Sequence, residues 1–139
     1  MPDRFGPRGV IALFIPLQNA NMQPEYEAMR PDGINNQIYR INLGIADRVP
    51  EAAIAAVDGA LGCWPDVVVV GNSVEMRLLT PPQFVEYRAA LQDKIGDIPL
   101  VTAADATIAA LKAVGAKRVA AISPMSNEYS QSVADYYEA

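Results

Sequence analysis

The hydrophobic positions of this chain fall into short apolar runs separated by stretches with helical spacing. Residues 67–70 are four consecutive valines, and residues 9–15 form a second apolar run without alternation. Short β-branched runs of this kind are typical of strands buried on both faces, as in a parallel sheet covered by helices. Pro16 ends the run at 9–15, because proline cannot donate a hydrogen bond to a neighbouring strand.

The rest of the chain continues this alternation. Residues 37–43 alternate strictly and predict a half-exposed edge strand, and 98–102 and 117–123 predict further strands. The helical stretches are 21–30, 49–61, 83–94, 103–114 and 127–139. Asn21 is the expected cap of the first helix, and Gly62 follows the second as its C-cap. Strands alternating with helices predict a three-layer α/β/α domain with a mostly parallel, flavodoxin-like sheet.

Composition and charge narrow the classes of function. A chain of 139 residues is about one domain, and 51% hydrophobic residues make it globular. A net charge of −5 without a Lys/Arg cluster argues against a nucleic-acid or anionic-membrane surface. No apolar run approaches the roughly 20 residues of a membrane span, and the start lacks the apolar segment of a signal peptide. We therefore expect a cytoplasmic protein.

The chain contains one cysteine, Cys63, and no histidine. This excludes an internal disulfide, a zinc site and a Ser-His-Asp triad within one chain. Any acid–base chemistry would have to use carboxylates, tyrosine, lysine, Cys63 or residues of a second chain. Cys63 precedes the valine strand, and its neighbour Trp64 indicates packing, so we interpret Cys63 as structural.

Small polar residues gather where three predicted strands end. The groups are Gln18/Asn19/Asn21, Asn72/Ser73 and Ser123/Ser126/Asn127. Open α/β sheets bind ligands at this edge, and neutral donors beside helix N-termini suit a carboxylate or phosphate. Ordinary turns with capping residues explain the same pattern at least as well. Glu75 is a candidate base or a first-turn carboxylate stabilised by the helix dipole. The motifs GxGxxG and GxxxxGK[ST] are missing, so a dinucleotide or P-loop site lacks its signature.

Three segments also carry a family pattern. Residues 9–22 read strand-Pro-x-x-Asn-x-x-Met, residues 66–73 read as a strand ending in Gly-Asn-Ser, and residues 110–124 read ALKAVGAKRVAAISP. In this order and spacing they resemble the aspartate/glutamate racemase superfamily, and most closely its maleate isomerase and arylmalonate decarboxylase branch. The decarboxylase strand ends in Gly-Thr-Ser, and the third segment resembles the family's ALxxLGxxRVAxxTPY.

The resemblance implies two α/β lobes with an active site between them. Residues 1–115 would form the first lobe, and 116–139 would begin a second lobe that the chain does not complete. The implied chemistry is proton transfer or addition, without cofactor or metal, at the carbon next to a carboxylate. The implied substrate-binding residues are Pro16, Asn19, Gly71, Asn72, Ser73 and Met125. Asn19 would hydrogen-bond the substrate carboxylate, and residues 71–73 would form an oxyanion pocket.

The chain departs from the family at its catalytic positions. Gly71 or Asn72 stands where racemases and isomerases carry their first cysteine. The decarboxylase has no cysteine at that position either. Met125 stands where the family has a tyrosine. Cys63 matches neither catalytic cysteine, so no residue receives a catalytic role.

Three functions stay open. The first is a decarboxylase, racemase or isomerase relative that binds a malonate- or maleate-like carboxylate. The second is a catalytically silent half-racemase that acts in binding or oligomerisation, and we expect a homo-oligomer. The third is an unrelated flavodoxin-like domain that binds a phosphate-bearing ligand.

Overall fold

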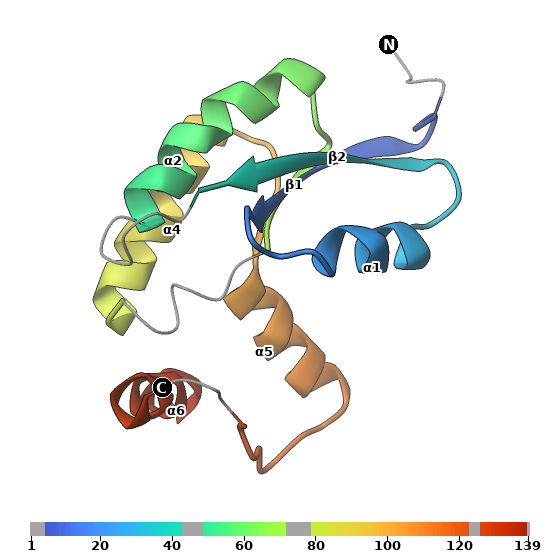
Figure 1. The fold of residues 1–139 in the computed structure, drawn as a ribbon. Coiled ribbons are helices and arrows are strands. Elements are labelled where there is room, and N and C mark those ends of the chain that lie inside the picture. Colours follow the sequence, from blue (N-terminus) through green and yellow to red (C-terminus); the bar gives the residue numbers. More distant parts are fainter. Residues whose placement is uncertain (1–4, 43–48, 72–78, 123–125, 139) are drawn as a thin grey trace.

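The computed structural model of the chain describes residues 5–42, 49–71, 79–122 and 126–138. Strands and helices alternate along these residues up to residue 113 (Figure 1). The strands are β1 (Gly9–Pro16), β2 (Ile34–Ile41), β3 (Val67–Val70) and β4 (Leu100–Thr102). The helices are α1 (Met22–Met29), α2 (Val49–Ala60), α4 (Pro81–Ile95), α5 (Ala103–Ala113) and α6 (Asn127–Glu138), and a 3₁₀ turn, η2 (Leu61–Cys63), follows α2.

The four strands form one parallel sheet in the order β2-β1-β3-β4. Phe14 of β1 lies opposite Tyr39 of β2 and Val70 of β3, which fixes the register across the middle of the sheet. The alternating strand β2 lies at an edge, as its pattern predicts, and the valine strand β3 lies inside the sheet. The predicted α/β class with a parallel sheet is confirmed.

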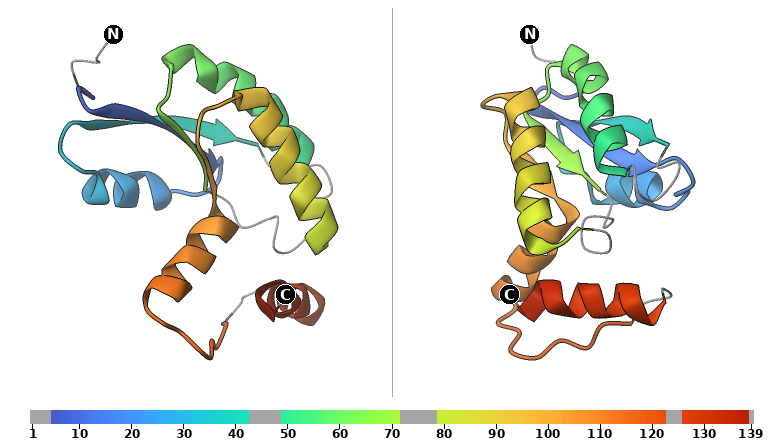
Figure 2. Two further views of the ribbon diagram at one scale, coloured as in Figure 1. Left: turned by 180° about the vertical axis from the view of Figure 1, so that it is seen from behind. Right: turned by 90° about the vertical axis from the view of Figure 1, so that its left-hand side faces the viewer.

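Helices cover both faces of this sheet (Figure 2). On one face, α2 and α4 pack side by side, and the main hydrophobic core lies between them and the strands. Phe14, Val57 and Leu91 in this core are fully buried. Each such side chain contributes about 1.5–3 kcal/mol to folding. On the other face, α1 contacts Asn36 and Arg40 of β2 through side-chain hydrogen bonds.

Local signals set most helix ends. Thr80 and Gln83 form a capping box before Pro81, and Gly96 with φ 63° ends α4. Gly115 with φ 65° follows α5, as predicted. Gly62 is not the C-cap of α2, because the chain first makes η2 and then turns at Trp64, which has a left-handed φ of 48°. Within the described residues, no helix combines the length and apolar character needed to cross a membrane.

The valine strand is buried on one face only. Val68 and Val70 are buried against the main core, whereas Val67 and Val69 on the α1 side stay partly exposed. The helix α1 has 8 residues and contacts β2, so it leaves that side of β3 only partly covered. The predicted burial on both faces is therefore wrong for this strand.

The predicted strand over 117–123 does not form in its described part, residues 117–122. These residues are exposed, and Ile122 is fully accessible to solvent. A strand needs a neighbour to satisfy its N–H and C=O groups, but α5 leads the chain away from the sheet before this segment begins (Figure 1). The chain then returns in α6, whose Tyr136 ring packs edge-on against Phe84 of α4 at 5.4 Å between ring centroids.

Candidate carboxylate site at the sheet edge

The carboxyl ends of β1 and β3 lie side by side. The backbone N–H of Gly71, directly after β3, donates a hydrogen bond to the carbonyl of Phe14 in β1 at 2.9 Å. Pro16 is the last residue of β1. The structure therefore brings the predicted positions Pro16 and Gly71 to neighbouring strand ends, at the edge where open α/β sheets bind ligands.

Asn19 lies in the turn between β1 and α1, and its side-chain oxygen is occupied. Oδ1 accepts hydrogen bonds from the backbone N–H groups of Asn21 and Met22, both at 2.9 Å. Asn19 therefore caps α1, whereas the side chain of Asn21, the predicted cap, makes no capping bond. Two backbone donors fix which end of the amide is the oxygen, so Nδ2 points away from the helix N-terminus. No described residue accepts a hydrogen bond from Nδ2, so Asn19 presents a donor.

Gly71 leaves room for the close approach of two other segments. A Cβ atom at this position would lie 2.5 Å from the end of the Met22 side chain and 3.1 Å from the Phe14 carbonyl oxygen. Glycine thus allows the start of α1 to pack directly on the end of β3. This contact places the Asn19 turn beside the end of the valine strand.

Arg40 reaches the Asn19 turn from the edge strand β2. Its Nη1 donates to the carbonyls of Leu17 at 3.3 Å and Asn19 at 2.9 Å, and its Nη2 donates to Oε1 of Gln23 at 3.0 Å. The sequence pattern does not mark this residue, because an arginine in an alternating edge strand predicts an ordinary solvent-exposed side chain. Its partners are backbone carbonyls of another segment, which no local pattern reveals.

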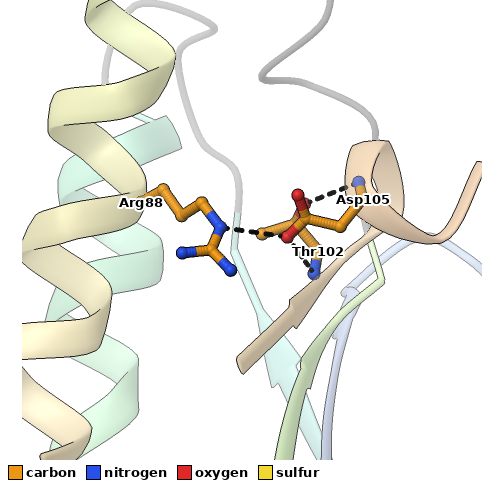
Figure 3. Close-up of polar contacts among 3 residues, drawn as sticks. All are labelled: Arg88, Thr102 and Asp105. Atoms are coloured by element: carbon orange, nitrogen blue, oxygen red, sulfur yellow. Dashed lines mark hydrogen bonds and ion pairs between the residues drawn. The ribbon is translucent and has the colours of Figure 1, made fainter. Parts of the chain in front are cut away.

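The third strand end in the described sheet carries a structural cluster (Figure 3). Thr102 at the end of β4 accepts a hydrogen bond through Oγ1 from the backbone N–H of Asp105, at 3.1 Å. Arg88 reaches from α4 and donates through Nε to Oδ2 of Asp105 at 3.1 Å. Asp105 is therefore engaged in capping α5 and in an ion pair, so it acts here as a structural carboxylate.

Comparison with known protein families and with curated proteins gives no match to this chain. Among solved structures, the chain is similar to the maleate isomerase of Pseudomonas putida S16, crystallised with maleate, with a TM-score of 0.75. The sheet and its helices therefore have a known counterpart. The fold is maleate isomerase-like. The similarity covers 94% of this chain at 19% sequence identity, and it spans 58% of the isomerase chain.

Three of the predicted site residues of this maleate isomerase-like fold lie outside the described residues. They are Asn72, Ser73 and Met125, and their place at the site stays a prediction, as does the role of Glu75. In the third polar group, Ser123 also lies outside them, while Ser126 and Asn127 stand at the start of α6, and the described residues between α5 and α6 form no strand. The described part of the predicted site is thus Pro16, Asn19 and Gly71.

Cys63 lies at the amino-terminal edge of the sheet, because it precedes β3. Its Sγ donates to the carbonyl of Ala60 at 3.2 Å. Burial raises the pKa of the Tyr39 phenol, and a hydrogen bond with Cys63 adds to this rise, so Tyr39 is protonated at neutral pH. Trp64 does not pack as predicted, since 81% of it is exposed.

Within the described residues, no group of three His, Cys, Asp or Glu side chains is arranged to hold a metal ion.

Proposed function

We propose that this chain binds a small dicarboxylate of the maleate type at the carboxyl ends of β1 and β3. The observation that carries the proposal is the locked amide of Asn19. Its oxygen is held by two backbone N–H groups, so the group that it offers at the sheet edge is an N–H donor. A fixed donor favours an acceptor ligand, and a carboxylate oxygen is the strongest common acceptor of this size.

Two further observations support a carboxylate as the ligand of this site. The chain shares its fold with a maleate isomerase that was crystallised with maleate. Its sequence also resembles the maleate isomerase and arylmalonate decarboxylase branch at Asn19 and at residues 71–73. Under this proposal, backbone N–H groups after β3 and the Ser73 hydroxyl would stabilise negative charge on the carboxylate oxygens.

Catalysis at this site would be proton transfer or addition at the carbon next to the bound carboxylate, and the negative charge that develops would be spread over the carboxylate oxygens. Pro16, Asn19 and Gly71, the described residues of the site, supply neither the base nor the nucleophile for such a step. A thiol at the site would have to come from elsewhere, because Cys63 lies at the opposite edge of the sheet. This position favours a second candidate, a catalytically silent module that binds a carboxylate without turning it over.

Isothermal titration with maleate, malonate and inorganic phosphate tests the binding. Asn19→Asp is the informative variant, because aspartate still caps a helix but replaces the donor by a charged acceptor. We expect the wild-type chain to bind maleate and this variant to lose at least about tenfold in affinity, the equivalent of about 1.4 kcal/mol.

Asn21→Asp is the matched control. It adds the same charge at the same helix end, but its side chain makes no capping bond. Equal loss in both variants would mean that charge alone is responsible and would remove the role of the Asn19 donor. Binding of phosphate with no response to dicarboxylates would favour a flavodoxin-like phosphate site instead.

A separate assay distinguishes the enzyme from the silent module. Proton NMR follows conversion of maleate, decarboxylation of substituted malonates and exchange of the α-proton with deuterated water. Turnover or exchange by the wild-type chain would support a catalytic site. Maleate binding without any of these reactions would support the silent module.

A further inference from the structure

Arg40 of the edge strand β2 contacts the turn that contains Asn19. We propose that Arg40 is a positioning residue that fixes this turn and supplies positive charge to the site. The inference rests on the proposed function and adds a determinant of its preference for anions. It is supported by the hydrogen bonds of Arg40 in β2, whereas the proposed carboxylate site is supported by residues at the ends of β1 and β3.

The contacts of Arg40 join three segments. Arg40 lies opposite Ile15 in the sheet register, one residue before the end of β2. One terminal nitrogen bridges the carbonyls of Leu17 and Asn19, and the other reaches Gln23 in α1. The planar guanidinium thus ties the edge strand to both sides of the turn that orients the Asn19 amide.

The charge of Arg40 is not neutralised by these partners, which are two carbonyls and an amide. Arg30, Arg88 and Lys94 each form an ion pair with a carboxylate. No described carboxylate pairs with Arg40. Because the chain carries a net charge of −5, an approaching dianion meets overall repulsion, and a local cation at the sheet edge offsets it. At physiological salt this effect extends over about 8 Å.

Lysine cannot replace this arrangement. A guanidinium presents several N–H groups in a rigid fork, whereas an ammonium is a compact charge on a flexible stem. Arg40→Lys therefore keeps the charge but loses the bridge between the turn and α1. Arg40→Gln loses both the charge and the bridge. The two variants together separate positioning from electrostatic attraction.

The test measures the maleate affinity of the full chain by titration at several salt concentrations. We expect Arg40→Gln to weaken binding by about tenfold or more and to flatten its salt dependence. Arg40→Lys should retain the salt dependence, and its affinity for maleate should lie between that of Arg40→Gln and that of the wild-type chain. Arg8→Gln is the matched control, because exposed Arg8 also donates to a backbone carbonyl, that of Asp32, but precedes β1 at the opposite edge.

A second readout reports on the turn itself. In ¹H–¹⁵N spectra, both Arg40 variants should shift the side-chain amide of Asn19 and the backbone amides of Asn21 and Met22, while Arg8→Gln leaves them in place. Wild-type binding with unchanged affinity, salt dependence and spectra in Arg40→Gln would overturn this inference alone. A wild-type chain that binds no dicarboxylate would overturn the proposed function and with it the role of the charge.

Discussion

Gly71 is a position where an added methyl group meets other atoms at once. The nearest, the end of the Met22 side chain, can rotate away, but the Phe14 carbonyl at 3.1 Å belongs to the sheet. We expect Gly71→Ala to lower the free energy of unfolding by about 1–3 kcal/mol, as overpacking does elsewhere. Urea denaturation measures this change. Combining it with Met22→Ala should recover part of the loss, which gives a favourable coupling energy.

Gly59→Ala is the control for this substitution. No atom lies within 4 Å of a Cβ at Gly59, which is inside α2. Alanine there should raise the free energy of unfolding by about 0.5–1 kcal/mol, because glycine is a poor helix former. If Gly71→Ala leaves the free energy of unfolding unchanged, the segments around Gly71 move apart at little cost. Their close packing would then not fix the geometry of the site.

Single residues also show what sequence can and cannot reveal about the site. Asn19 and Gly71 could be placed at the sheet edge, because both follow runs that are clearly strands. The exact cap could not, since Asn19 and Asn21 are equally good capping residues and only the turn geometry selects between them. Arg40 was missed because its role depends on a contact with a turn more than twenty positions earlier in the chain.

At the scale of elements, the junction of β4 and α5 depends on one hydroxyl. Thr102 is fully buried, and its Oγ1 accepts from the Asp105 N–H. Thr102→Val keeps the shape but leaves that N–H without its acceptor. We expect a loss of about 1–2 kcal/mol in the free energy of unfolding, measured in urea.

Thr107→Val is the matched control within the same helix. Its hydroxyl donates to the Ala103 carbonyl at 2.8 Å inside the helix, so its loss leaves no N–H unsatisfied. A change within about 0.5 kcal/mol is expected. If the two valine variants are equally destabilised, the capping bond is not what stabilises the start of α5.

The elements differ in how far the sequence determines them. Helices such as α4 carry their own signals, with Thr80 and two prolines at the start and Gly96 at the end. The strands of the sheet are predicted by apolar runs or, for β2, by alternation. Residues 119–122 are also an apolar run but form no strand, because a strand also needs a partner. Sequence shows the tendency of a segment to pair, but not whether a partner lies within reach.

At the scale of the whole molecule, the sheet and the carboxyl-terminal region are connected in two ways. Covalently, α5 and residues 116–122 lead from β4 to α6, and non-covalently Tyr136 packs on Phe84 of α4. The chain corresponds to 58% of the isomerase with the similar fold. A second lobe beginning at residue 116 and a homo-oligomer both stay predictions, and light scattering after size-exclusion chromatography tests the second.

Hydrogen exchange tests the state of residues 117–122 in solution. No described hydrogen bond involves a backbone N–H of these residues, and Val119 is more than half exposed. We expect their amides to exchange at the first time point, whereas amides of β1 and β3 are protected by the sheet. Ala120→Pro should leave the free energy of unfolding unchanged within about 0.5 kcal/mol, since the N–H that it removes has no acceptor among the described residues.

The opposite result would be informative about assembly. Protection of residues 117–122 that grows with protein concentration, and that Ala120→Pro abolishes, would mean that the segment pairs as a strand with a second copy of the chain. Edge pairing of this kind satisfies the exposed N–H and C=O groups. The apolar residues Val119 and Ile122 would then be buried in the partner interface, and light scattering would show a dimer that the proline variant lacks.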